Sequence, residues 1–104
     1  MAKFIVTEGL MAASITCVGQ LELSYDRDAD VLYISIGTPR PAYSHAEDHG
    51  LLLRKDPKNG DLVGATILDY EEHFCRLPDL SWLTATPLPE EIIAYLRERP
   101  TLPS

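Results

Sequence analysis

The stretch that decides the fold runs from residue 21 to residue 36 and reads Leu21-Glu22-Leu23-Ser24-Tyr25-Asp26-Arg27-Asp28-Ala29-Asp30-Val31-Leu32-Tyr33-Ile34-Ser35-Ile36. In its first half, apolar and polar side chains alternate with a period of two, which predicts a half-buried strand. Residues 27–30 form a polar turn, and residues 31–36 are apolar on both faces, which is typical of a central strand. The stretch therefore predicts an antiparallel hairpin with a loop of about four residues.

The segments after this hairpin predict further strands of the same sheet. Residues 42–48 are polar and are preceded by prolines, which is typical of an edge strand. Residues 51–55 and 62–68 predict a second hairpin, because the turn between them contains the pair Asn59-Gly60, which tolerates the positive φ of a tight turn. Residues 1–20 have no deciding period, so they predict only an N-terminal extension of strand or helix.

Short helices are predicted after the last strand. Asp69 is in position to cap a first helix, and Glu72, three residues later, is in position to reach back to the cap. This helix is short because Pro78 follows soon after it. Residues 79–83 predict another helical turn.

The clearest helix begins at Pro89 and ends at Pro100, with acidic residues in its first turn and Arg97 and Arg99 in its last. Apolar residues recur along one side of it at helical spacing, namely Leu88, Ile92, Tyr95 and Leu96. We interpret this stripe as core, with a dimer or partner face as the alternative. The aromatic part of the core is expected to comprise Tyr70, Phe74, Trp82 and Tyr95.

A run of strands followed by helices indicates an α+β fold. We expect a four- to five-stranded antiparallel meander sheet with C-terminal helices packed on one face. The 104 residues are expected to form a single domain over residues 1–104. Within it, the sheet spans residues 21–68, the helical part spans residues 69–99, and residues 100–104 form a tail.

Composition and charge exclude several classes of protein. A hydrophobic content of 45% and a charged content of 24% are ordinary for a folded domain. The net charge of −7 disfavours nucleic-acid binding, because phosphates would be repelled. The chain has neither an apolar run of membrane-spanning length nor the cysteines of a disulfide framework. We therefore expect a cytoplasmic protein that does not bind membranes, with free thiols at Cys17 and Cys75.

The first hairpin resembles the opening of a known family. Tyr25-Asp26, three further residues, and then Asp30 followed by Val31-Leu32-Tyr33-Ile34 are similar to the signature of a widespread small prokaryotic domain of unknown function. The second hairpin is also similar to that family, so the resemblance covers about residues 21–74. It implies a small sheet-plus-helix module with no established activity and no assigned catalytic residue. Some members of the family are encoded next to small toxin-like proteins, so the resemblance implies an antitoxin-like role as one option.

Three aspartates alternate in the first turn, namely Asp26, Asp28 and Asp30, in the way that a calcium-binding loop begins. An EF-hand also needs glycine at its sixth position and glutamate at its twelfth, where this chain has Val31 and Gly37. We therefore interpret the aspartates as turn residues that accept backbone hydrogen bonds. The other expected turn and cap residues are Asn59, Gly60 and Asp69.

His45, Glu47 and His49 share one face of the predicted edge strand and have side chains of the types that bind zinc. Alternate residues of a strand lie about 6–7 Å apart, so all three could reach one ion only with a bend or a second chain. Two interpretations stay open: a solvated edge strand, or a zinc or nickel ion shared between two chains. His73 would join such a site only if its helix packs against this edge.

No constellation for nucleophilic catalysis is evident in the sequence. Cys75 and His73 do not face each other on a helix, and the chain has no nucleophile-elbow or phosphate-loop motif. We therefore expect a protein that is not an enzyme and needs no cofactor. The favoured function is a binding or interaction module that self-associates, most simply as a homodimer. The alternatives are an antitoxin-like partner of a small basic protein and a metal-binding protein that uses His45, Glu47 and His49.

Overall fold

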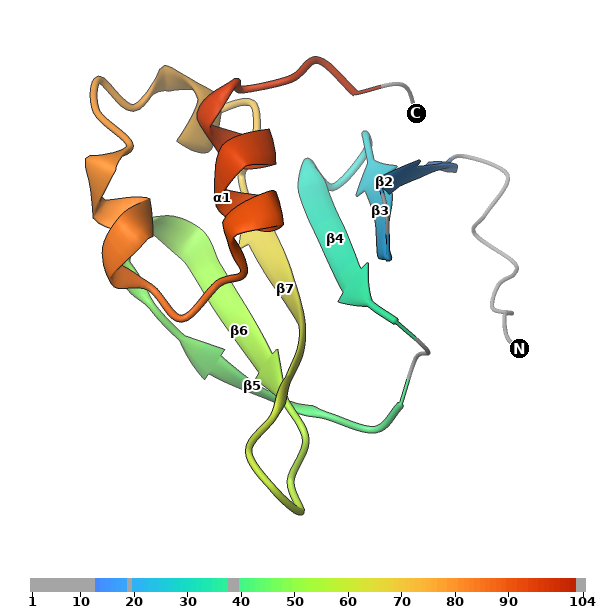
Figure 1. Ribbon diagram of the computed structural model, residues 1–104. Coiled ribbons are helices and arrows are strands. Elements are labelled where there is room, and N and C mark those ends of the chain that lie inside the picture. Colours follow the sequence, from blue (N-terminus) through green and yellow to red (C-terminus); the bar gives the residue numbers. More distant parts are fainter. Residues whose placement is uncertain (1–12, 19, 38–39, 103–104) are drawn as a thin grey trace.

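The computed structural model describes residues 13–18, 20–37 and 40–102. These residues have an α+β fold built on a six-stranded antiparallel sheet, with the strand order β2-β3-β4-β7-β6-β5 (Figure 1). The strands are β2 (Ala13–Val18), β3 (Leu21–Asp26), β4 (Val31–Ile36), β5 (Tyr43–Ala46), β6 (Leu51–Lys55) and β7 (Leu62–Leu68). The helical segments are the 3-10 helices η2 (Asp48–Gly50), η3 (Phe74–Arg76) and η4 (Ser81–Ala85), and the α-helix α1 (Glu90–Arg97).

Both predicted hairpins are confirmed. β3 pairs with β4 across the polar turn of residues 27–30, and β6 pairs with β7 across the turn that contains Asn59 and Gly60. β6 and β7 begin and end at the predicted residues. Gly60 has a φ of 77°, which is the positive value that the Asn-Gly pair predicts.

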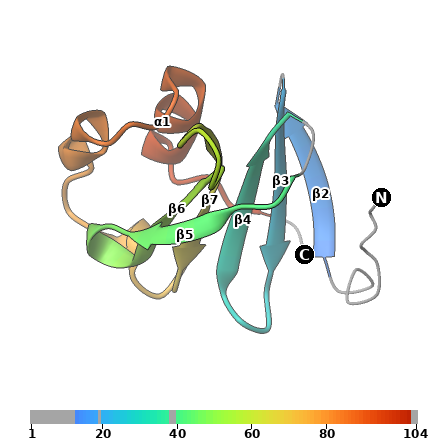
Figure 2. The same ribbon diagram turned by 90° about the horizontal axis from the view of Figure 1, so that it is seen from below.

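The expected five strands over residues 21–68 are confirmed, but the expected meander is wrong. After β4 the chain crosses to the far edge of the sheet, where it forms β5, and β7 rather than β5 pairs with β4. Burial explains this order, because all four residues of β5 are exposed, whereas residues 63–67 of β7 are buried. A polar strand suits an edge, and an apolar one suits the centre. The additional strand, β2, lies in the N-terminal extension and pairs with β3 at the other edge (Figure 2).

The strand register assigns residues to two faces of the sheet. One face, which we name the core face, carries two rows of residues that run from β3 to β6 and that are each at most 2% exposed, namely Leu23, Ile34, Ala65 and Leu53, and Tyr25, Leu32, Ile67 and Leu51. These side chains share one buried cluster with eight that follow the sheet in the chain: Tyr70, Phe74, Leu80, Leu83, Leu88, Ile92, Leu96 and Leu102. The hydrophobic core therefore joins the sheet to the C-terminal segment.

The helix expected after β7 is not formed, and neither is the cap expected at Asp69. Asp69 has a φ of 51°, in the left-handed region, whereas a helix N-cap has an extended backbone. Residues 70–73 form turns, and only the short η3 follows them. The amides of Glu71 and Glu72, which a cap at Asp69 would bind, donate to the carboxylate of Asp30 instead.

The C-terminal helix is confirmed, with a shorter extent than expected. Pro89 precedes α1 as its N-cap, α1 ends at Arg97, and Arg99 has a φ of 49°, so the helix stops before Pro100. The further turn expected at residues 79–83 is the slightly later η4. The apolar stripe belongs to the core as interpreted, with Tyr95 half-buried and three members buried: Leu88, Ile92 and Leu96. Among the described residues, no helix has both the length and the apolar character needed to cross a bilayer.

The aromatic core contains one residue more than the sequence predicts. Tyr70 and Phe74 are fully buried with their rings stacked at 5.7 Å, and Trp82 packs against the cluster while partly exposed. The additional member is Tyr25, whose ring meets the ring of Tyr70 edge-on at 5.8 Å. Tyr25 was expected only as one alternating residue of a strand, because its partner lies far along the chain.

Gly64 in β7 generates a test of the central strand pair. A Cβ atom at this position would overlap the backbone carbonyl oxygen of Ile34 on β4. We expect Gly64→Ala to lower the free energy of unfolding by about 1–3 kcal/mol, because the two strands must move apart. Urea denaturation measures this change. Gly60→Asn is the control, since its position is open and asparagine tolerates a positive φ, and an equal loss in both variants would contradict the explanation.

Candidate functional site

The carboxylate of Asp30 is the most connected polar group at the first hairpin. Its Oδ1 atom accepts hydrogen bonds from the Tyr25 hydroxyl at 2.7 Å and from the Glu71 amide at 2.8 Å. Its Oδ2 atom accepts from the Glu72 amide at 3.0 Å, and its backbone carbonyl accepts from the Tyr70 amide at 3.0 Å. Asp30 thus joins the β3–β4 turn to the turn that follows β7.

The ionisation of this cluster follows from its hydrogen bonds. Burial disfavours the charged form of Asp30, but the donors from Glu71, Tyr25 and Glu72 outweigh burial and hold the pKa of the carboxyl below its usual value. Burial and the hydrogen bond to Asp30 raise the pKa of Tyr25. Asp30 is therefore a charged acceptor whose donors all come from the protein itself, which is the arrangement of a structural group.

Other predicted turn residues also accept backbone amides. Asp26 Oδ1 accepts the amide of Ala29 at 3.1 Å, which is the hydrogen bond that the turn interpretation requires. Asn59 Oδ1 accepts the amide of Asp61 at 2.9 Å in the second hairpin. These contacts, together with those of Asp30, account for two of the three alternating aspartates as parts of the fold.

The structure divides the three candidate metal ligands into two groups. His45 Nε2 lies 3.2 Å from Glu47 Oε2 at the end of the edge strand β5. His49 lies in η2 with a φ of 62°, so the strand geometry that would align it with the other two is lost. Its ring instead lies 4.6 Å from that of Trp82 and 5.8 Å from that of His73. His73 therefore approaches His49 and not the His45–Glu47 pair.

Each of these two groups brings together few candidate ligands for a metal ion. Over the parts of the chain that the structure describes, no three His, Cys, Asp or Glu side chains are placed to hold a metal ion. Zinc sites use three or four protein ligands, whereas His45 and Glu47 offer two. Cys75 is a free thiol, and burial raises its pKa, which is the opposite of the shift that activates a nucleophile. The side chain of Cys17 lies outside the described residues.

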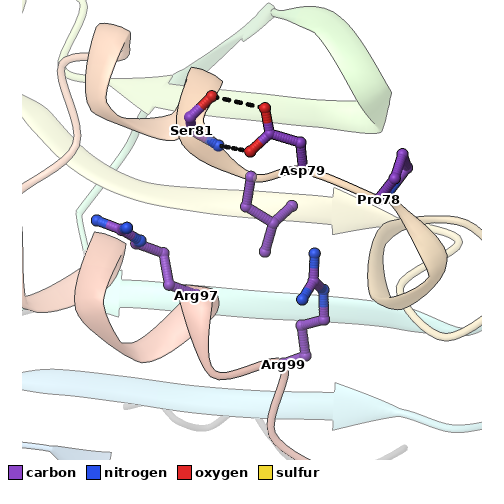
Figure 3. A pocket seen from close by; sticks show the side chains of 6 residues that line it. Pro78, Asp79, Ser81, Arg97 and Arg99 are labelled. Carbon is purple, nitrogen blue, oxygen red and sulfur yellow. Dashed lines mark hydrogen bonds between the residues drawn. The ribbon is translucent and has the colours of Figure 1, made fainter.

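An open pocket of about 230 Å³ lies between η4 and the end of α1 and is lined by Pro78, Asp79, Leu80, Ser81, Arg97 and Arg99 (Figure 3). Both carboxylate oxygens of Asp79 accept hydrogen bonds from Ser81, at 3.0 Å from its amide and 2.9 Å from its hydroxyl. Arg99 donates to the carbonyl of Leu77 at 2.7 Å. In Figure 3 the side chains of Arg97 and Arg99 extend in different directions, so their guanidinium groups do not converge on one small anion.

The face of the sheet opposite the core face, which we name the outer face, is a further candidate. The register places on it residues from the four strands β3, β4, β7 and β6, namely Glu22, Ser24 and Asp26; Val31, Tyr33 and Ser35; Gly64, Thr66 and Leu68; and Leu52 and Arg54. The charged members all lie on β3 and β6. The two central strands, β4 and β7, contribute only uncharged residues to it.

The centre of the outer face exposes more apolar surface than the solvent-facing side of an ordinary antiparallel sheet. Tyr33 is 42% exposed and Leu68 is 39% exposed, whereas their partners in the register, Thr66 and Val31, are buried. The solvated face of an antiparallel sheet is normally polar. Patterns in the sequence did not predict this surface. The available signal was the apolar character of residues 31–36 on both faces, which indicated a central strand but not the exposure of Tyr33 on one of them.

The hydrogen bonds of Asp30 predict a pH-dependent stability. Asp30→Asn keeps the side-chain shape and tolerates the φ of 58°, but it removes the charge and one acceptor. We expect it to lower the free energy of unfolding by about 1.5–3 kcal/mol at neutral pH. Because the pKa of Asp30 is lowered by folding, this contribution is present above the unfolded pKa and disappears as the pH falls below about 4.

Urea denaturation of both proteins between about pH 3 and about pH 7 measures this difference. Asp28→Asn is the matched control, because Asp28 is an exposed aspartate of the same turn and should change stability little. A difference between wild type and Asp30→Asn that is equally large at both ends of the pH range would contradict the role of the charge.

Comparisons with known proteins give a match to a family of unknown function, which agrees with the resemblance at that level. Curated proteins and solved structures offer no significant match to this chain. The family-level comparison covers the sheet from β3 to the end of β7 and therefore includes both hairpins and Asp30. Residues 22–70 match the model of the family described as "Protein of unknown function (DUF2283)".

Proposed function

We propose that the protein is a non-enzymatic interaction module that self-associates through the outer face of its sheet. The observation that carries the proposal is the uncharged centre of that face, where Tyr33 and Leu68 are exposed. The centres of protein interfaces are depleted of charge and enriched in aromatic residues. In a chain with a net charge of −7, an uncharged surface is also where a second copy meets the least repulsion.

The proposal requires that the helical segments pack on the core face and leave the outer face accessible. The buried side chains of η3, η4 and α1 belong to the cluster that the core face forms. In Figure 2, α1 lies on one side of the strands. These two observations support an outer face that is open to a partner.

The size of the sheet is compatible with a weak dimer. Six strands of up to seven residues present roughly 500 Å² per copy in flat projection, given about 4.8 Å between strands and about 3.4 Å per residue. Two copies would bury about 1,000 Å², which is near the lower limit of a specific interface. We therefore expect a concentration-dependent dimer with a dissociation constant on the order of micromolar.

A charge at the centre of the outer face should separate the two copies. Tyr33→Glu places a carboxylate where the proposed interface excludes water, so we expect the dissociation constant to rise by at least about tenfold. Sedimentation equilibrium, supported by light scattering after size exclusion, measures this constant. Tyr43→Glu is the matched control. Tyr43 is similarly exposed, at 49%, but it does not lie on the outer face, because the outer-face positions of β5 are Ser44 and Ala46.

Two outcomes would contradict the proposal. A wild-type protein that stays monomeric up to about millimolar concentration has no self-association to explain. Dissociation by Tyr43→Glu, with no effect of Tyr33→Glu, would move the contact to the edge strand β5.

A further inference from the structure

The charges of the outer face change sign from one side of the sheet to the other. Glu22 on β3, Ser35 on β4, Gly64 on β7 and Arg54 on β6 form one row of the register. Along the four strands from β3 to β6, a carboxylate and a guanidinium therefore flank two uncharged positions, and the row continues to Cys17 on β2 and Ser44 on β5. The positions of Glu22 and Arg54 are equally far from the line that separates β4 from β7. With the residues that the structure describes, neither Glu22 nor Arg54 forms an ion pair within 4 Å.

We infer, on the basis of the proposed function, that the partner is a second copy of this chain, related by a two-fold axis that runs parallel to the strands between β4 and β7. This axis places β3 of one copy over β6 of the other. Each row of the register in one copy then faces the same row in the other copy. Glu22 then faces Arg54 of the partner subunit. Because the operation is two-fold, the contact occurs twice, and each copy contributes both charges.

The same axis brings the uncharged rows together at the centre. Tyr33 lies over Thr66 of the partner subunit, and Val31 lies over Leu68 of the partner subunit. Two sheets that pack face to face keep their strands within about 30° of each other, so the row-on-row arrangement tolerates the twist of each sheet. The result is an apolar centre flanked by ion pairs on both sides, in keeping with interfaces whose charges lie outside an apolar core.

The other two-fold axis in the plane of the interface, which runs across the strands, gives the opposite electrostatics. It would place β3 over the same strand of the second copy, so that Glu22 faces Asp26 of the partner subunit. Two pairs of like charges would then repel each other. The charge row therefore selects the axis parallel to the strands.

Charge reversal tests this axis. Glu22→Arg changes the net charge by +2, from −7 to −5, so general repulsion between copies falls and would by itself tighten the dimer. The inferred axis predicts the reverse, a dissociation constant raised about tenfold or more at low salt, because the introduced guanidinium would oppose Arg54 of the partner subunit. Arg54→Glu should weaken the dimer as well. The double variant Glu22→Arg/Arg54→Glu keeps the net charge and should return the constant to within about threefold of wild type.

Mixing the two single variants tests whether the pairing is between copies. In a mixed dimer, the two arginines of one copy face the two glutamates of the other, so the mixture should form heterodimers more tightly than either variant forms homodimers. Sedimentation equilibrium of the separate and mixed variants measures this. Glu91→Arg on α1 is the control, because it makes the same change in net charge at an exposed position outside the outer face. Unchanged urea midpoints establish that each variant is folded.

The possible results are distinguishable. Weakened single variants, with recovery in the double variant and in the mixture, support the inferred axis. Single variants that dimerise as tightly as wild type, or a tighter dimer of Glu22→Arg, overturn the axis, while dissociation by Tyr33→Glu would leave the proposed function standing. A wild type that never dimerises overturns the proposed function and the axis together.

Discussion

The fold depends on one carboxylate that holds together two turns far apart in the chain. Asp30 accepts hydrogen bonds from Tyr25, five residues away, and from the amides of residues 71–72, more than forty residues away. Because both turns meet at this group, β7 returns alongside β4 and completes the centre of the sheet. The same turn carries Tyr70, whose ring packs on Tyr25 and whose hydroxyl donates to the carbonyl of Pro100 at 2.7 Å. One charged group thus links the first hairpin to the C-terminal segment.

Local patterns in the sequence predict the parts of the fold that depend on neighbouring residues. The period of two after Leu21 and the Asn59-Gly60 turn were sufficient for both hairpins. The strand order was not predictable in this way, because it depends on which strands can bury each other. Asp69 illustrates the same limit: its local pattern resembles a helix cap, but the acceptor for the amides of residues 71–72 is Asp30. A window of a few residues does not contain that competitor.

The candidate surface was the part that sequence reasoning predicted least. Histidines and carboxylates are readily proposed as metal ligands from a sequence, because their chemistry is specific. In the fold, however, His45 contacts Glu47, whereas His49 contacts Trp82. On the strands β3, β4, β7 and β6, the outer face carries no histidine or cysteine, and it becomes visible only after pairing assigns Tyr33 and Leu68 to the same side of the sheet. Residues 31–36 signalled a central strand correctly. The missing information was which face the rest of the chain covers.

The two distant donors to Asp30 have a consequence for the boundaries of the module. They are backbone amides, so the contact makes no demand on the side chains at positions 71 and 72. The family match, however, ends at residue 70. A piece of the chain cut to the matched segment would keep the charged acceptor and lose two of its three donors. The contacts that hold Asp30 therefore extend beyond the matched segment, and substitutions at positions 71 and 72 that keep the backbone amides leave them intact.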